Sequence, residues 1–145
     1  MTTPERVYVA LGSNVGDRAA HLAQARARLA TIPSSQLVAV STIEETAPLG
    51  PVAQGPYLNQ MVALDTTLDP RVLLEQLLAI EAEQGRTRGE RWGPRTLDLD
   101  IVMFGDRVID EQGLTIPHRE LRQRDFWQRE LLELAASTAA ATTRA

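Results

Sequence analysis

Apolar residues alternate with polar ones along several short segments of the chain and recur at helical spacing along others. Alternating segments rich in Val, Ile and Tyr predict strands, and apolar positions one helical turn apart predict a buried helix face. The stripe Leu22, Ala25, Leu29 and Ile32 predicts a helix whose N-cap is Asp17. The expected strands cover residues 6–11, 36–45, 57–67 and 97–104, and the expected helices cover residues 18–31, 70–84 and 126–136.

The second helix carries its own start signal. Asp69 suits the N-cap and Pro70 suits the first helical position, where a missing N–H is tolerated. Residues 108–109 predict a further short strand, and Pro117 closes another extended segment. The inward stripe of the second helix is Leu73, Leu77 and Ile80.

The element order β-α-β-β-α-β predicts an α+β, ferredoxin-like fold, with helices packed on one face of an antiparallel sheet. A length of 145 residues suits one domain with a sizeable core. We expect a single domain over residues 1–136. The Ala- and Thr-rich tail, residues 137–145, is expected to fray.

Composition excludes several functions. The chain has no cysteine, which rules out disulfides and thiolate catalysis, and no lysine, which rules out Schiff-base chemistry and the phosphate-loop lysine. A net charge of −4 argues against a nucleic-acid partner. No apolar stretch is long enough to span a membrane, and the first residues do not resemble a signal peptide. We therefore expect a cytoplasmic protein without membrane or nucleic-acid partners, and nothing demands more than a monomer.

Residues 91–101, RWGPRTLDLDI, carry the strongest chemical signal. On a strand, Asp98 and Asp100 share one face about 6.6 Å apart, a spacing at which two carboxylates can converge on hard cations. Charged residues inside an apolar strand are disfavoured unless paired, so metal binding is preferred to solvated carboxylates. Leu97, Leu99, Ile101 and Met103 are expected on the opposite face. The arginines at 86, 88, 91 and 95 suit phosphate oxygens.

Aromatic and polar side chains elsewhere suggest a ring-binding site. Tyr57 and Asn59 share a strand face, so one could stack on a ligand ring while the other reads its polar edge. Trp92 lies in a polar loop and could cover such a ring, although it and Phe126 could equally be core residues. His118 by itself is more typical of a surface or capping residue than of a catalyst.

Several motifs together resemble the 6-hydroxymethyl-7,8-dihydropterin pyrophosphokinase family of folate biosynthesis. They are residues 9–14, 46–51 with 57–59, 91–101, 115–118 and 124–126, and they extend over nearly the whole chain in the family's order. The resemblance implies a Mg²⁺-dependent enzyme with two metal ions. It would transfer a pyrophosphoryl group from ATP to the pterin hydroxymethyl oxygen and release AMP.

Residue roles follow from the same resemblance. Asp98 and Asp100 are the implied metal ligands. The implied catalytic set is Arg86, Arg95, Asp98, Asp100 and His118. The implied pterin contacts are Thr46, Leu49, Tyr57, Asn59, Trp92 and Phe126. The implied ATP contacts are Glu81, Arg86, Arg88, Trp92, Arg95, Ile101, Thr115, His118 and Arg124.

The chain departs from the family pattern at three positions. Leu78 replaces a glutamine, Gly113 replaces an arginine and Arg119 replaces an aromatic residue or proline. One alternative function is a non-catalytic relative that binds pterin or nucleotide as a sensor or partner module. Another is a ferredoxin-like RNA-binding domain, which would need aromatic residues on the sheet face and a basic surface; the acidic charge disfavours it.

Overall fold

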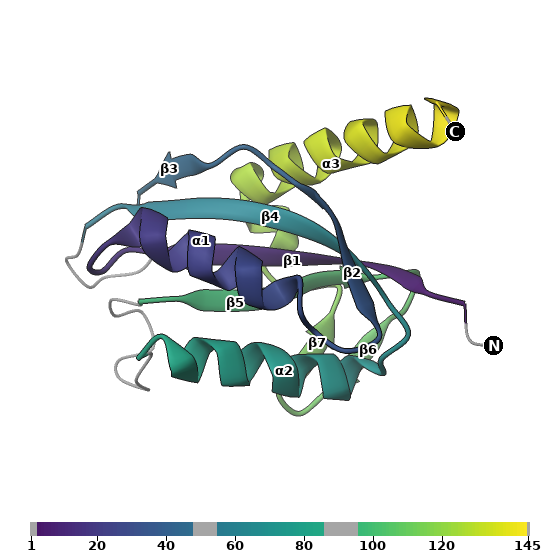
Figure 1. The fold of residues 1–145 in the computed structure, drawn as a ribbon, viewed down its shortest axis with the longest axis horizontal. Helices are drawn as coiled ribbons and strands as arrows, with labels where there is room; N and C mark the ends of the chain where they lie inside the picture. The colour runs from purple at the N-terminus through teal and green to yellow at the C-terminus, as the bar shows by residue number, and fades with distance from the viewer. Residues whose placement is uncertain (1–2, 48–54, 86–95, 145) are drawn as a thin grey trace.

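The computed structural model describes residues 3–47, 55–85 and 96–144, with side-chain burial through residue 138. Figure 1 shows the elements in chain order. They are β1 (Glu5–Ser13), α1 (Arg18–Leu29), β2 (Ser35–Val40), β3 (Glu44–Thr46), β4 (Tyr57–Thr66), α2 (Pro70–Glu83), β5 (Asp98–Phe104), β6 (Ile109–Glu111), β7 (Leu114–Ile116), the 3-10 turn η1 (Leu121–Gln123) and α3 (Asp125–Arg144).

The main sheet has the order β2-β4-β1-β5, and the short strand β3 also pairs with β4. Each of these pairings is antiparallel. Helix α1 connects β1 to β2, and α2 connects β4 to β5, so each crossover leaves one strand inserted between its ends. This arrangement confirms the expected α+β, ferredoxin-like fold. The strands β6 and β7 form a separate hairpin.

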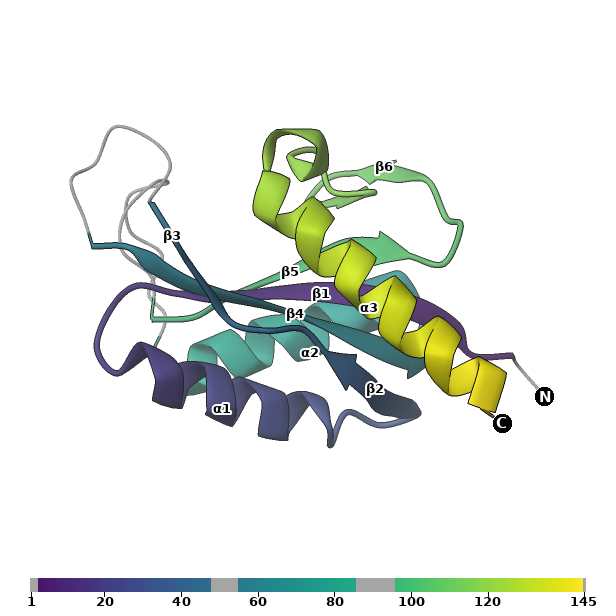
Figure 2. The same cartoon turned by 90° about the horizontal axis from the view of Figure 1, so that it is seen from above.

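The helices lie on both faces of the sheet. Figure 2 shows α1 and α2 beneath the sheet and α3 across its other face. The expectation that the helices share one face is therefore right for the two crossover helices and wrong for α3. An alternating strand can bury both of its faces when both carry apolar side chains, and β1 does so: Val7, Val9 and Leu11 face α1 and α2, whereas Tyr8 and Ala10 face α3.

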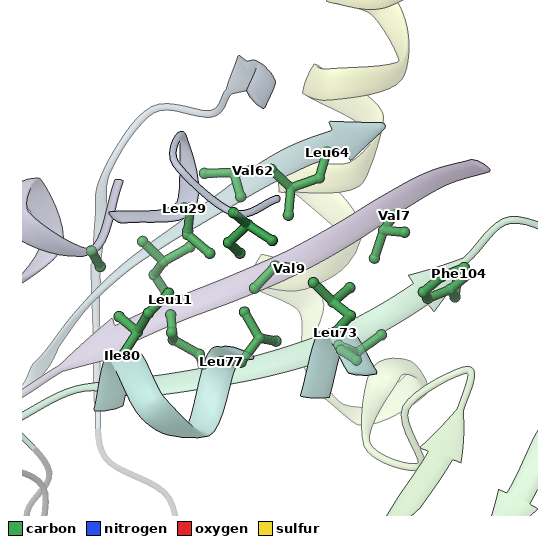
Figure 3. Packing of buried hydrophobic residues seen from close by; sticks show 14 of the residues in the cluster. Val7, Val9, Leu11, Leu29, Val62, Leu64, Leu73, Leu77, Ile80 and Phe104 are labelled. Atoms are coloured by element: carbon green, nitrogen blue, oxygen red, sulfur yellow. The ribbon is translucent and has the colours of Figure 1, made fainter. Parts of the chain in front are cut away.

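The core beneath the sheet has the residues that helical spacing predicted. Leu22, Ala25 and Leu29 of α1 and Leu73, Leu77 and Ile80 of α2 are buried against β1, β4 and β5, as Figure 3 shows for most of them. Full burial of one such side chain stabilises the fold by about 1.5–3 kcal/mol. The fold therefore depends on this apolar layer.

The two predicted N-caps differ in detail. The Asp17 carboxylate accepts a hydrogen bond from the Ala20 N–H at 3.1 Å, which confirms it as the cap of α1. Asp69 does precede α2, with Pro70 in the first turn, but its side chain makes no capping bond. The Asp69 carbonyl instead accepts from the Leu73 N–H at 3.0 Å.

The expected strand over residues 36–45 is split into β2 and β3. Ser41 leaves the regular pairing, since its Oγ accepts from the Met61 N–H at 2.9 Å. The Thr42 N–H and hydroxyl then both donate to the Glu133 carboxylate of α3. The Glu133 side chain of α3 thus accepts from the Thr42 N–H, a donor that a continuous strand would have used in its pairing with β4.

The face assignment of Met103 is also corrected. The pairing of β1 with β5 shifts register between Tyr8 and Val9, where Val102 is the extra residue of a β-bulge. The bulge reverses the alternation: Met103 packs on the α3 side and Phe104 on the α1–α2 side.

The last helix is longer than expected. It runs to Arg144, whereas the hydrophobic stripe alone predicted an end near residue 136. Alanine has the highest helix propensity, so the Ala-rich segment extends a helix that the packed first turns have begun. The domain boundary at residue 136 stays a prediction. Among the described residues, no helix is both long and apolar enough to cross a membrane.

A buried carboxyl group on α3 lies next to Glu44 of β3. Glu130 is 1% exposed, and within the described residues neither of its oxygens, nor Oε2 of Glu44, has a hydrogen-bond partner as long as both groups are carboxylates. Burial and the neighbouring Glu44 carboxylate raise the pKa of Glu130 to about 9, whereas its hydrogen bond to Glu44 lowers the pKa of Glu44. Glu130 is thus protonated at neutral pH and donates to Glu44, with Arg129 and Glu133 as the other charged neighbours.

We expect Glu130→Gln to change the pH dependence of stability. Folding takes up a proton between the unfolded pKa near 4.5 and the folded pKa of about 9, so the wild-type chain loses stability as pH rises through that range. Glutamine needs no proton, so the unfolding free energy of the variant should gain on that of the wild type by about 1.4 kcal/mol per pH unit, or about 4 kcal/mol between pH 5 and pH 8. Urea unfolding across this range measures the difference. The exposed Glu75→Gln is the control, and equal pH slopes for wild type and Glu130→Gln would refute the protonated pair.

Candidate active site

The register of three neighbouring strands assembles a row of chemically useful side chains. Gly12 of β1 lies opposite Asn59 of β4 on one side and opposite Asp98 of β5 on the other. Two residues earlier on β1, and on the same face, Ala10 lies opposite Asp100. Neighbouring strands are about 4.8 Å apart, so Asn59 and Asp98 are separated by about twice that distance. The row lies where β1 ends and β4 and β5 begin, at the left in Figure 1.

Gly12 keeps the space above the centre of this row open. A Cβ atom at this position would lie 3.4 Å from Asn59 Oδ1 and 3.4 Å from Tyr57 Cδ1. The side chains of Tyr57 and Asn59 therefore lie over the β1 backbone and share one face, as the sequence predicted. A larger residue at position 12 would crowd both.

The two aspartates also lie as predicted. Asp98 and Asp100 are each partly buried and alternate with the fully or nearly fully buried Leu97, Leu99 and Ile101. The apolar set belongs to the core beneath the sheet, so the carboxylates lie on the α3 face with Tyr57 and Asn59.

His118 is brought to Asp100 by the bulge in β5. The His118 N–H donates to the Val102 carbonyl at 2.9 Å, and its Nε2 lies 3.6 Å from Asp100 Oδ1. Its Nδ1 accepts from the Glu120 N–H at 3.1 Å, so in the neutral ring the proton is on Nε2. The structure thus adds a neighbour that the sequence alone did not show, since a ring N–H of His118 faces the Asp100 carboxylate. The catalytic role of His118 stays a prediction.

A cavity of about 270 Å³ lies along the outer edge of β5, between α2 and β7. It brings together four predicted residues, Asp100, Ile101, Thr115 and His118. Its remaining lining residues are Leu74, Leu99, Gly113, Leu114 and Arg119. Two of the three departures from the family pattern, Gly113 and Arg119, therefore lie in this wall, whereas Leu78 is a 40% exposed residue of α2 outside it.

Glu81 has a backbone partner that the sequence did not reveal. Its side chain is 6% exposed, and Oε2 accepts from the Leu99 N–H at 2.7 Å. Leu99 separates the two aspartates on β5. The carboxylate of Glu81 thus fixes the strand segment that carries Asp98 and Asp100, from the α2 side of the sheet.

The predicted ring-binding residues come from three elements. The Asn59 side-chain N–H donates to Thr46 Oγ1, and Thr46 is the register partner of Tyr57. Phe126 lies in the first turn of α3 and packs into the cluster on the same face of the sheet. The described structure therefore places Thr46, Tyr57, Asn59 and Phe126 on the α3 side.

Trp127 is a contributor that sequence reasoning missed. It is 2% exposed, its ring contacts that of His118 edge-on at 4.9 Å, and the Arg124 guanidinium lies 4.4 Å from its ring centre. The signal was its position seven residues before the buried Leu134, which puts both on one stripe of α3.

Five predicted residues lie outside the described part of the chain. They are Leu49, Arg86, Arg88, Trp92 and Arg95. Their roles stay predictions.

The fold and the site define a ferredoxin-like α+β protein whose paired carboxylates lie between Tyr57 and Asn59 of β4 and a cavity at the outer edge of β5. Residues 8–136 match the 7,8-dihydro-6-hydroxymethylpterin-pyrophosphokinase family. The chain belongs to this family.

Curated relatives agree with this membership. The chain is 47% identical over 131 residues to the 2-amino-4-hydroxy-6-hydroxymethyldihydropteridine pyrophosphokinase of Pseudomonas aeruginosa, covering 90% of this chain and 81% of the relative. It is 45% identical over 130 residues to the protein of the same name from Methylorubrum extorquens, with 90% and 82% covered. The Bacillus subtilis protein of that name is 45% identical over 127 residues, with 88% and 76% covered.

We expect Glu81→Leu to leave the Leu99 N–H without a hydrogen-bond acceptor, because leucine has no oxygen that could replace Oε2 of Glu81. The free energy of unfolding should fall by about 1–3 kcal/mol, the cost of an unsatisfied donor. Glu81→Gln retains an oxygen acceptor and should stay closer to wild type. Urea unfolding together with hydrogen exchange at the Leu99 amide measures both effects. Glu83→Leu removes a surface ion pair of the same helix and should leave Leu99 exchange unchanged; a slow Leu99 amide in Glu81→Leu would contradict the assignment.

Proposed function

We propose that this chain transfers the pyrophosphoryl group of ATP to the hydroxymethyl oxygen of 6-hydroxymethyl-7,8-dihydropterin, a step in folate biosynthesis. The products are AMP and the pterin diphosphate. Membership of the pyrophosphokinase family supports this reaction.

One geometric observation carries the proposal at the level of the site. Asp98 and Asp100 lie between Asn59 on β4 and the cavity at the outer edge of β5. A pterin read by Asn59 and a nucleotide in the cavity would therefore meet over the carboxylates. This is where the reacting phosphates need charge neutralisation.

The donor set of β5 fits Mg²⁺. Asp98 and Asp100 offer hard oxygen ligands on one face, and Mg²⁺ is commonly held by one or two carboxylates with phosphate oxygens and water completing its shell. No group of three or more acidic or histidine side chains suited to a metal occurs within residues 3–47, 55–85 and 96–144, which agrees with a site completed by the nucleotide. Two such ions would polarise the phosphates and lower the pKa of the attacking hydroxyl.

The pterin is assigned to the α3 face. Tyr57 and Phe126 would stack on its ring, and Asn59, with Thr46, would read its polar edge. The Asn59 amide is oriented by its bond to Thr46 Oγ1, so its remaining donor and acceptor positions are preset for a planar ligand. Leu49 and Trp92 are proposed to complete this pocket.

The nucleotide is assigned to the β5 edge. Ile101 and Thr115 line the cavity and would contact the adenosine, while the Nε2–H of His118 and the Arg124 guanidinium would donate to phosphate oxygens. Arg86, Arg88 and Arg95 are proposed as further phosphate contacts. The Glu81 carboxylate already accepts from the Leu99 N–H at this edge, so we assign it to holding the strand rather than to contacting ATP.

The protein's share of the reaction is mainly positioning. The hydroxymethyl oxygen attacks the β-phosphorus, the bond from that phosphorus to the oxygen shared with the α-phosphate breaks, and the hydroxyl proton is released. Tyr57, Asn59 and Phe126 orient the attacking group, while His118 and the arginines hold the phosphates in line and balance the charge on the departing AMP. We also propose that the protein acts as a monomer in the cytoplasm.

Product analysis tests the function directly. Incubation with ATP, Mg²⁺ and 6-hydroxymethyl-7,8-dihydropterin should give AMP in equal amount to the pterin diphosphate, and no AMP without the pterin. ADP as the product would refute pyrophosphoryl transfer. Pterin binding without turnover would favour a sensor or partner module instead.

We expect Asp98→Asn and Asp100→Asn each to lower kcat at least about 100-fold, because each removes a carboxylate that holds the charge-neutralising metal. Pterin affinity, measured by calorimetry without ATP, should stay near wild type, since the pterin contacts come from other elements. Asp106→Asn, in the turn after β5, is the matched control. Near wild-type turnover in either site variant would remove the aspartates from the mechanism.

A further inference from the structure

Trp127 contacts both of the described side chains that we propose as phosphate contacts, His118 and Arg124. Its indole is 2% exposed in the cluster between α3 and the sheet, with Ala10, Met61 and Val102. Trp127 directly follows Phe126 in the first turn of α3. Phe126 is a proposed pterin contact, whereas Trp127 is a buried core residue.

The first contact of Trp127 is with His118. The two rings meet at 4.9 Å between centroids and 86° between planes, an edge-to-face arrangement that fixes the tilt of the imidazole. The two ring nitrogens of His118 are directed to the Glu120 N–H and to Asp100. Packing by Trp127 and the bond from Glu120 therefore restrain the rotation that would turn Nε2 away from the carboxylate.

The second contact is with Arg124. Its guanidinium lies 4.4 Å from the indole ring, and its Nη2 donates to Glu120 Oε2 at 2.6 Å. The guanidinium carbon thus lies over the ring face, while the buried Arg124 Nε has no hydrogen-bond acceptor among the described residues. The backbone N–H of Trp127 also donates to the backbone carbonyl of Arg124 at 3.0 Å.

We propose that Trp127 is a positioning residue for the nucleotide-phosphate site, holding His118 by its ring edge contact and Arg124 by its ring face. The inference rests on the proposed function, because it takes His118 and Arg124 as phosphate contacts. Trp127 itself is buried and touches no ligand. The Trp127 ring also meets that of Phe126 edge-on at 6.2 Å between centroids. The other pterin residues, Tyr57 and Asn59, are held by the β1–β3–β4 side of the sheet, so we expect the larger effect on the nucleotide.

Steady-state kinetics of the full chain test this role. Trp127→Leu fills the core without an aromatic ring and should lower kcat/KM for ATP roughly tenfold, while KM for the pterin stays near wild type. Trp127→Phe restores a ring and should recover most of the loss. Leu134→Ala opens a cavity in the same cluster, so it should lower stability yet leave both constants unchanged while the chain is folded.

A double-mutant cycle separates positioning from general packing. In a His118→Ala, Arg124→Ala background, Trp127→Leu should cost much less than it does in the wild-type background, because its effect passes through these two side chains. Additive losses, or equal losses in Trp127→Leu and Leu134→Ala, would overturn the positioning role while leaving the proposed function intact. Absence of pterin-dependent AMP from the wild-type chain would overturn both.

Discussion

The site depends on the register of β1 between β4 and β5. Because Gly12 is flanked by Asn59 and Asp98, the ring-reading amide and the first carboxylate are held two strand spacings apart by backbone hydrogen bonds. A slip of one residue would turn every one of these side chains to the opposite face. The apolar alternation of Val7, Val9 and Leu11 prevents such a slip, since it would expose the core beneath the sheet.

The strand β5 lies at the edge of the sheet. The backbone N–H and C=O groups on the outer side of an edge strand have no neighbouring strand with which to pair. Two features occupy this side. Glu81 accepts from the Leu99 N–H between the aspartates, and the Val102 carbonyl at the bulge accepts from the His118 N–H. The cavity lies along the same edge. The outer side of the strand is thus where α2, the bulge and the segment after β7 fix the groups that we propose as catalytic.

The helix α3 joins the two halves of the site from above. Its first turn presents Phe126 and Trp127, its Glu133 binds the backbone at Thr42, and its Glu130 shares a proton with Glu44 beside β3. These contacts tie the strand carrying Thr46 to the segment carrying His118. The helix therefore connects the proposed pterin side to the proposed nucleotide side through packing as well as through the sheet.

The sequence by itself determined the elements, the ferredoxin-like order, the inward stripes of α1 and α2, and the shared face of Asp98 with Asp100. These follow from local periodicity and from motifs, which are properties of neighbouring residues. Only the tertiary structure decided the split of β2 from β3, the bulge that turns Met103 and the position of α3 on the opposite face. It also decided the contacts of His118 with Asp100, of Glu81 with Leu99 and of Trp127 with His118 and Arg124. Each of these depends on partners far away in sequence, such as Thr42 with Glu133 or Leu99 with Glu81, and no local pattern encodes which distant group satisfies a buried donor or covers a ring.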